Sequence, residues 1–349
     1  MLKNNKRKVA VAMSGGVDSS VSAALLKEAG FDVVGVFMKF WAGDNRRCFE
    51  GSEKRARKIA GILKIPFHVF DFKKEFKRKI VDPFLADYKK NITPNPCVVC
   101  NKEIKFGLFL KKAKALGAEF IATGHYARVK QEKNNLALIK ARDKEKDQSY
   151  FLWKLNQNQL KHVLFPVGGY LKSEVKKMAK DLKLPVFDLP DSQEVCFIDK
   201  TTNEFLRKYL KIKLGKIVDK KSKVLGKHQG LWFYTIGQRK GIKLSGGPYY
   251  VIDKDEKKNR LIVSKNKKDL YKKELSLKNV SWISSKNPKL PLKVKAKIRY
   301  GHKSAEAVVS KIKTKYVLKF KKPQIAVTPG QSAVFYDKNK LIGGGVIVL

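Results

Sequence analysis

Two cysteines of this chain stand three positions apart in a proline-rich segment, and a third follows an acidic turn. Cys97 and Cys100 belong to residues 93–101 (TPNPCVVCN), and Cys196 belongs to residues 191–198 (DSQEVCFI). We expect a helix directly after Cys100, and the dipole of a helix favours a thiolate at its N-terminus. The pattern therefore predicts Cys100 as a nucleophile. Half of a zinc site or a redox pair are alternatives, but the chain has no second CxxC and no matching HxxxH.

A glycine-rich hexapeptide near the N-terminus has the composition of a phosphate-binding loop. Residues 14–19 (SGGVDS) lie between a mostly apolar run, 8–13, and a segment with helical spacing of small and apolar residues, 20–28. A strand, a glycine turn and a helix direct backbone N–H groups and the positive end of the helix dipole toward one point. Gly15 and Gly16 let a phosphate approach the backbone closely. The loop is not a Walker loop, because the pattern GxxxxGK[ST] is absent.

Both groups of residues need a scaffold, and the first part of the chain has the pattern of a doubly wound parallel α/β sheet. Up to about residue 205, strand-like and helix-like segments alternate. We expect strands at 8–13, 31–38, 66–70 and 120–122, and helices at 20–28, 52–63, 102–116 and 173–182. These segments predict a catalytic domain at residues 1–209.

The helical signal fades beyond about residue 210, and short β-like runs take over. Runs at 231–236, 249–253 and 260–264 are separated by glycines and predict a small β-rich central domain at residues 210–274. Alternation is clearer at 292–298, 316–320, 332–336 and 345–349, which predicts a barrel-like β domain at residues 275–349 with lysines on its exposed face.

The charge of the chain indicates a polyanionic partner. Lysine and arginine number 77 against 31 aspartates and glutamates, a net charge of +46. Lysines spread over a surface bind phosphate backbones, although a biased genome also produces lysine-rich proteins without such a partner. No apolar run reaches the length of a membrane span, and residues 1–8 are too short and polar for a signal peptide. We therefore expect a cytoplasmic protein with no membrane partner.

Seven motifs occur in an order that resembles the bacterial tRNA-specific 2-thiouridylases, which belong to the N-type ATP pyrophosphatases. Besides residues 14–19, 93–101 and 192–198, the motifs are 123–128 (TGHYAR), 146–150 (KDQSY), 237–241 (GQRKG) and 328–333 (TPGQSA). The resemblance covers essentially the whole chain. It implies that ATP, with Mg²⁺, is cleaved between its α- and β-phosphates at the glycine loop.

The resemblance also implies a two-step sulfur transfer to the wobble uridine of tRNAs for lysine, glutamate and glutamine. ATP adenylates the C2 oxygen of the base, and sulfur then displaces AMP. Cys196 matches the cysteine that receives sulfur from a donor protein as a persulfide, and Cys100 matches the nucleophile that closes a transient disulfide with Cys196. The implied ATP-binding residues are Ala12, Met13, Ser14, Gly15, Gly16, Val17, Asp18, Ser19, Met38 and Gly124.

The base has to leave the anticodon stack to reach these groups. The resemblance implies contacts to the base or the tRNA from Asn95, Pro96, Cys97, His125, Lys146, Asp147, Gln148, Arg299, Tyr300 and Gln331. From the residue types alone, Arg299 and Tyr300 fit a phosphate contact and a stacking contact. From its residue type alone, His125 would be assigned a structural role. We include it among the site residues because it belongs to the TGHYAR motif.

One position departs from the family pattern. Many members carry aspartate where this chain has Cys97, and that aspartate is the proposed proton handler, so the general acid/base role is unassigned here. The change also yields three thiols, Cys97, Cys100 and Cys196, that are candidate ligands of an iron–sulfur cluster. A cluster in place of a persulfide would then carry the sulfur.

Two other classes of protein compete with an ATP-dependent tRNA sulfurtransferase. One is an amidoligase-type ATP pyrophosphatase that acts on a small molecule, against which the basic β domain and the paired cysteines argue. The other is a non-catalytic RNA-binding protein held by a metal ion, which would bind tRNA without forming AMP.

Overall fold

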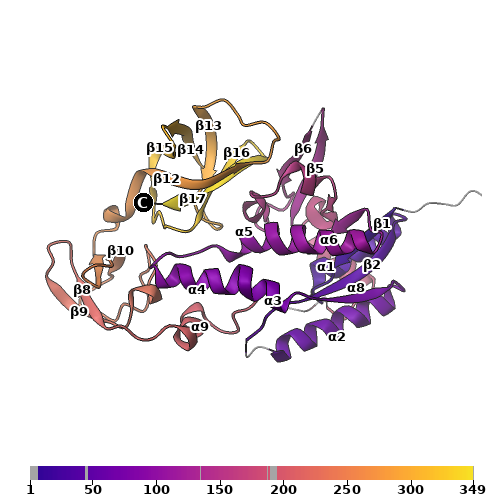
Figure 1. Ribbon diagram of the computed structural model, residues 1–349, viewed down its shortest axis with the longest axis horizontal. Coiled ribbons are helices and arrows are strands. Elements are labelled where there is room, and N and C mark those ends of the chain that lie inside the picture. The colour runs from indigo at the N-terminus through magenta and orange to yellow at the C-terminus, as the bar shows by residue number, and fades with distance from the viewer. Residues whose placement is uncertain (1–6, 44–45, 134, 187, 189–194, 349) are drawn as a thin grey trace, which may run out of the picture.

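The computed structural model describes the whole chain except residues 1–6, 44–45, 134, 187, 189–194 and 349 (Figure 1). The first part of the predicted motif at 191–198 therefore lies outside the described residues. A five-stranded parallel sheet has the strand order β3–β2–β1–β4–β7, with β1 at its centre. The strands are β1 (Lys8–Ala12), β2 (Asp32–Lys39), β3 (Phe67–Asp71), β4 (Phe120–Ala122) and β7 (Val163–Leu164).

Helices cover both faces of this sheet, so the prediction of a doubly wound fold is confirmed. Val9 and Val11 of β1 pack with α1, α2 and α8 on one face, whereas Ala10 and Ala12 pack with α3 to α6 on the other. The first group is α1 (Val17–Glu28), α2 (Arg46–Ile62) and α8 (Lys172–Asp181), and the second is α3 (Lys73–Phe76), α4 (Asp82–Lys89), α5 (Pro96–Cys100) and α6 (Phe109–Ala115).

The helix expected at 102–116 begins earlier than predicted, at Pro96. Proline fits the first position of a helix, because the N–H group that it lacks would have no partner there. From Pro96 the chain runs through α5, a π-helical stretch η2 (Asn101–Leu108) and α6 without a break. A second π-helical stretch, η1 (Lys77–Val81), joins α3 to α4 in the same way. Cys100 therefore lies inside a helix and not ahead of one, which corrects the expected position of this thiol.

Shorter helical segments connect the sheets. They are η3 (Ser149–Leu152), α7 (Gln157–Leu160), η4 (Pro166–Gly169), α9 (Thr202–Tyr209), η5 (Leu231–Phe233) and η6 (Lys267–Leu270).

A small sheet of order β10–β11–β8–β9 follows the α/β part of the chain. Its strands are β8 (Gly215–Val218), β9 (Val224–His228), β10 (Tyr250–Asp255) and β11 (Arg260–Ser264). The β-like run at 231–236 is not a strand. It is a short 3₁₀ turn, η5, between Gly230 and Gly237, which both have positive φ, and Leu231 and Phe233 fill the core below the turn.

Six antiparallel strands close into a C-terminal barrel, as the alternation predicts. They are β12 (Tyr271–Trp282), β13 (Leu292–Lys297), β14 (Ala305–Ile312), β15 (Lys315–Ile325), β16 (Ser332–Asp337) and β17 (Lys340–Val348), and β12 pairs with β17 to close the ring. Val309, Phe320 and Phe335 are fully buried in the barrel core. Lys293 and Lys295 alternate with the inward residues of β13 and face solvent.

A hairpin from the α/β part of the chain extends the barrel sheet. It consists of β5 (Ala127–Glu132) and β6 (Asn135–Lys140), and β6 pairs with β17 through Ile139↔Lys340 and Leu138↔Leu341. Figure 1 shows the barrel above the start of α5, with the hairpin beside it and the sheet of β8 to β11 at one end of the molecule. The TGHYAR segment is therefore tied to the barrel through the hairpin that follows it.

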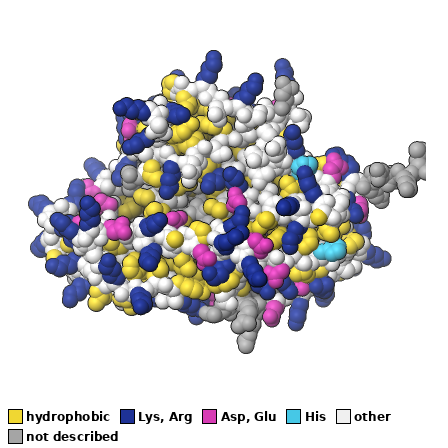
Figure 2. All heavy atoms as spheres, viewed as in Figure 1, with side chains coloured by type: hydrophobic (Ala, Val, Ile, Leu, Met, Phe, Trp, Pro, Cys, Tyr) yellow, Lys and Arg dark blue, Asp and Glu magenta, His cyan; other side chains and the backbone are white. Residues whose placement is uncertain are grey.

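Basic side chains are distributed over the visible face of the molecule and do not form one patch (Figure 2). Acidic groups lie among them. Within the described part of the chain, no helix combines the length and the apolar character that crossing a membrane requires.

A candidate nucleotide loop and a candidate thiol site

The glycine loop joins β1 to α1 as the sequence predicts, and Gly15 is the residue on which its course depends. Gly15 has φ +76°, and a Cβ atom there would lie 2.4 Å from the backbone oxygen of Ser52. Gly16 caps α1, and as a glycine it has no side chain to bond the first N–H groups of the helix. Ser19 Oγ instead accepts from the backbone N–H of Ser14 and donates to Gly16 O, at 3.1 Å each. The loop keeps the geometry of an anion site.

The carboxylate of Asp18 is the most strongly bound polar group of this loop. Lys172, from the start of α8, donates to both of its oxygens at 2.6 and 2.8 Å, and the Tyr126 hydroxyl donates to it at 2.8 Å. The Lys172 side chain is only 11% exposed. Sequence reasoning missed Lys172 because 154 residues separate it from Asp18, and a lysine at a helix start gave no signal among so many lysines.

The other predicted ATP-binding residues lie around the loop. Gly124 packs against it so closely that a Cβ atom there would lie 2.7 Å from the Ser19 nitrogen. Met38 is half-buried in β2. Ala12, Met13 and Val17 are buried, so their side chains serve the core.

All three predicted thiols are free, and the structure brings them into one neighbourhood. Cys97 is half-buried, Cys100 is buried and Cys196 is exposed to solvent. Cys97 and Cys100 lie near enough to Cys196, and Cys97 to Cys100, that a thiolate at one position would raise the pKa of the next. Lys105 of η2 acts electrostatically on all three thiols and on His125. His125 follows Gly124, which contacts the glycine loop at Ser19 and Asp18.

The environment of these thiols does not favour the thiolate, contrary to what the expected helix N-terminus suggests. Burial raises the pKa of Cys100 from 9.0 to about 12, and the positive charge of Lys105 opposes this only in part. Burial also raises the pKa of Cys97. Burial of the thiol raises the pKa of Cys196 as well, although the residue as a whole is exposed. Cys100 therefore stays protonated at neutral pH.

His125 and the KDQ segment are placed among protein groups. His125 is buried, its Nδ1 lies 2.7 Å from Thr123 Oγ1, and burial lowers its pKa well below 6.5. Asp147 is buried and accepts from the Ala141 and Ser149 nitrogens. The Gln148 side chain accepts from the Tyr126 nitrogen at 2.9 Å. Lys146, the first residue of this segment, is half-buried.

The predicted contacts on the barrel lie close to this segment. The ring of Tyr300 lies 4.6 Å from that of Phe151 and 6.1 Å from that of Tyr150, and Lys297 lies over it. Tyr300 keeps about a third of its surface exposed, so a base could stack on it. Arg299 is half-buried beside it.

Gln331, Asn95 and Pro96 also lie together. The Gln331 side chain donates to the carbonyls of Thr93 and Pro94, directly before Asn95. Asn95 and Pro96 are the cap and the first residue of α5.

No three Cys, His, Asp or Glu side chains among the described residues are grouped so as to hold a metal ion. The three thiols as they lie therefore do not fit a cluster.

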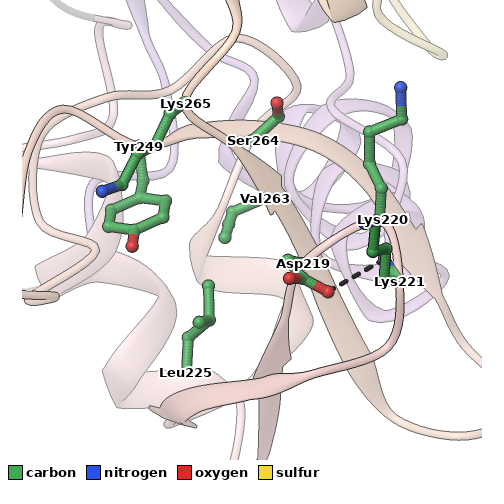
Figure 3. Close-up of a pocket in the computed structure, with 8 residues that line it drawn as sticks. All are labelled: Asp219, Lys220, Lys221, Leu225, Tyr249, Val263, Ser264 and Lys265. Atoms are coloured by element: carbon green, nitrogen blue, oxygen red, sulfur yellow. Dashed lines mark hydrogen bonds between the residues drawn. The ribbon is translucent and has the colours of Figure 1, made fainter.

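A pocket of about 290 Å³ lies in the sheet of β8 to β11, away from the predicted site residues (Figure 3). Lys220, Lys221 and Lys265 line it, with Lys265 over the ring of Tyr249. Asp219 accepts there from the Lys221 nitrogen. None of the predicted site residues lines this pocket.

The fold and the loop define the class of this protein, an α/β nucleotide-binding enzyme of HUP type with two appended β units. Family models agree: a "tRNA methyl transferase HUP domain" matches residues 7–200, a "tRNA methyl transferase PRC-barrel domain" matches 203–265, and an "aminomethyltransferase beta-barrel domain" matches 272–347.

Full-length relatives give the family itself. The chain is 46% identical to "tRNA-specific 2-thiouridylase MnmA 2" of Thermoanaerobacter sp. (strain X514), over 99% of this chain and 98% of the relative. It is 43% identical to "tRNA-specific 2-thiouridylase MnmA" of Clostridioides difficile (strain 630), over 98% of each. The chain belongs to the tRNA-specific 2-thiouridylase family. A solved 4-thiouridine synthetase–RNA complex with bound ATP is similar at 17% identity and TM-score 0.38, covering 54% of this chain and 44% of that chain.

Proposed function

We propose that this protein is an ATP-dependent tRNA-uridine 2-sulfurtransferase that thiolates the wobble uridine of tRNAs for lysine, glutamate and glutamine. The observation that carries the proposal is that three free thiols lie near one another in a chain that also has a phosphate-type loop between β1 and α1. A small-molecule amidoligase would not require a thiol pair, and a non-catalytic RNA-binding protein would not require the loop.

The first step uses the glycine loop. The N–H groups at the start of α1 bind phosphate oxygens, and the C2 oxygen of the uridine attacks the α-phosphorus, forming a C2–O–AMP adduct and releasing pyrophosphate. Lys172 supplies a positive charge at Asp18, on the loop. Asp18 is also the loop's carboxylate, so it is the group that would hold Mg²⁺, which neutralises phosphate charge when bound.

The second step uses the thiols. The terminal sulfur of a Cys196 persulfide attacks C2, and AMP leaves with the C2 oxygen. The Cys100 thiolate then attacks the inner sulfur, so that the S–S bond of the persulfide breaks, the base keeps the outer sulfur, and a Cys100–Cys196 disulfide forms. An external dithiol reduces this disulfide and completes the cycle. A sulfur-donor protein in the cytoplasm loads the exposed Cys196 again.

Cys100 can act only after it loses a proton that burial holds tightly. Lys105 is the positive group that favours the thiolate at all three cysteines. We assign Lys105 this electrostatic role in the second step. Burial raises the pKa of Cys97, so its thiol is a weaker acid than a free thiol, and we leave the general acid/base role unassigned.

Two of the matching domain descriptions name a tRNA methyl transferase, and this activity is the second candidate. Methyl transfer would require neither cleavage of ATP to pyrophosphate nor a second thiol. The mass of the modified nucleoside separates the two, because exchange of oxygen for sulfur and addition of a methyl group give different increments.

The test is to incubate the full chain with unmodified tRNA, ATP, Mg²⁺ and a persulfide donor, and to follow pyrophosphate and 2-thiouridine. We expect both products, and we expect pyrophosphate release to require tRNA. Release with a small amine acceptor in place of tRNA would contradict the proposal. A parallel anaerobic reaction after reconstitution with iron and sulfide decides the sulfur carrier, because activity only after reconstitution would overturn the persulfide route.

A further inference from the structure

The backbone that leads into α5 is contacted by both β units. Thr235 and Lys254 belong to the unit that contains β8 to β11. Thr235 Oγ1 lies 3.2 Å from Thr93 Oγ1, and Lys254 donates to Asn91 O. The Thr93 nitrogen donates to Pro329 O, from the barrel loop before β16. Three residues after Thr93 the helix with Cys97 and Cys100 begins, so the position of this backbone decides where the thiols stand.

Gln331 makes the most specific of these contacts. Its side-chain nitrogen donates to Thr93 O at 3.0 Å and to Pro94 O at 3.1 Å. A carboxamide has two N–H donors, and both are used here on protein carbonyls. The opposite orientation would point the amide oxygen at two carbonyl oxygens, so the contact itself fixes which atom is nitrogen.

The barrel loop approaches this backbone as closely as it does because residue 330 is glycine. Gly330 has φ +89°, and a Cβ atom there would lie 2.3 Å from the Ile92 side chain and 2.7 Å from Thr93 O. The loop is in turn fixed to the barrel, since the Gly330 nitrogen donates to Ile347 O and the Ile347 nitrogen donates to Gln331 O.

A second bridge reaches the cap of α5. The hydroxyl of the buried Tyr150 donates to Ser332 O at 2.9 Å, and the Asn95 side chain lies near enough to this hydroxyl to lower its pKa. Asn95 is the residue before Pro96, where α5 begins. Gln331 therefore holds Thr93 and Pro94, and its neighbour Ser332 holds Tyr150, which lies beside Asn95.

We propose that Gln331 is a positioning residue of the thiol site, which holds the start of α5 and thereby limits the exposure of Cys97 and Cys100 in the protein without tRNA. The catalytic consequence rests on the proposed thiolation, whereas the positioning of the thiols does not. With both amide hydrogens in use, only the Gln331 oxygen remains to meet a tRNA.

The experiment measures alkylation of individual cysteines by iodoacetamide in the full chain without tRNA, resolved by mass spectrometry. Because Cys100 is buried, its alkylation requires local opening, and a weaker hold on α5 raises the open population. We expect Gln331→Ala to accelerate alkylation of Cys100 roughly fivefold, as the loss of one net hydrogen bond predicts. Gln331→Glu, whose carboxylate would face two carbonyls, accelerates it further.

Gln324→Ala is the matched control. The Gln324 side chain also donates to two backbone carbonyls, of Lys322 and Pro323, but these belong to its own barrel strand. This variant should leave alkylation of Cys100 unchanged. Thiolation kinetics add a second readout, since a positioning role lowers kcat more than it raises the KM for tRNA.

Two outcomes would overturn the proposal. In one, both Gln331 variants are alkylated at the wild-type rate while tRNA binding weakens, which would make Gln331 a tRNA contact only. In the other, all cysteines react faster and the melting temperature falls, which would make the effect a general loss of stability. Absence of thiolation by the wild-type chain would defeat the proposed function but leave the alkylation result readable.

Discussion

The nucleotide loop and the thiol site are assembled in different ways. The loop is one run of six residues whose course comes mainly from its own backbone, and its distant polar partners include Lys172 and Tyr126 on Asp18. The thiol site is assembled from residues before α5, from Cys196 far along the chain, and from contacts of both β units. Local assembly makes a site robust to the arrangement of the other units, whereas distributed assembly makes its geometry depend on all of them.

The largest expected effect comes from Cys196→Ser, which should abolish the activity of the thiol site and leave that of the nucleotide loop intact. Cys196→Ser removes the atom that carries sulfur, so we expect 2-thiouridine formation to fall below detection while tRNA-dependent pyrophosphate release continues. Parallel assays of both products check this. Loss of pyrophosphate release in the same variant would mean that the two regions do not act independently, and full thiolation would remove Cys196 from the mechanism.

Gly15→Ala is the corresponding change in the loop. It places a Cβ atom 2.4 Å from the Ser52 oxygen at φ +76°, so we expect pyrophosphate release to fall on the order of 100-fold, from the free energy of such strain. Gly30→Ala is the control, because Gly30 also has positive φ but has nothing within 4 Å of an added Cβ. Alkylation of Cys100 should not change in either variant.

Lys172→Met tests the charged partner of the loop carboxylate, Asp18. The change removes a mostly buried positive charge with two hydrogen bonds to Asp18, and we expect the KM for ATP to rise roughly tenfold. Lys8→Met, which removes the exposed 3.7 Å ion pair with Asp32 on the adjacent strands, should have little effect. A lower KM in Lys172→Met would instead show that Lys172 competes with Mg²⁺ for Asp18.

The pH dependence of the thiol site gives a smaller effect. Because the pKa of Cys100 is about 12 in the folded chain, its alkylation should keep rising with pH through pH 10, without a plateau near 9. The unfolded chain loses the same proton near pH 9, so the free energy of unfolding falls above that pH, by at most about 1.4 kcal/mol per unit. Chemical denaturation of the wild type and of Cys100→Ser between pH 8 and 10 measures this, and equal slopes would contradict the raised pKa.

The same contrast explains what the sequence could predict. The loop, the parallel sheet and the closed barrel follow from local patterns, and the structure confirms these elements. The expected position of Cys100, just ahead of a helix, was wrong. The helix begins at Pro96, six residues before the expected start, and continues through α5 and η2. Lys172, Gln331 with Thr93, and the pairing of β6 with β17 depend on contacts between distant residues, which no local pattern encodes.

The hairpin of β5 and β6 also sets an order of events during synthesis. Strand β6 pairs with β17, which is translated much later. The edge of β6 that pairs with Leu341 therefore leaves the ribosome with its backbone groups exposed to water. The α/β layer can assemble first, but the segment that holds His125 gains its last neighbour only when the barrel closes. A ribosome that stops early therefore releases a chain with a formed nucleotide loop and an unfinished thiol site.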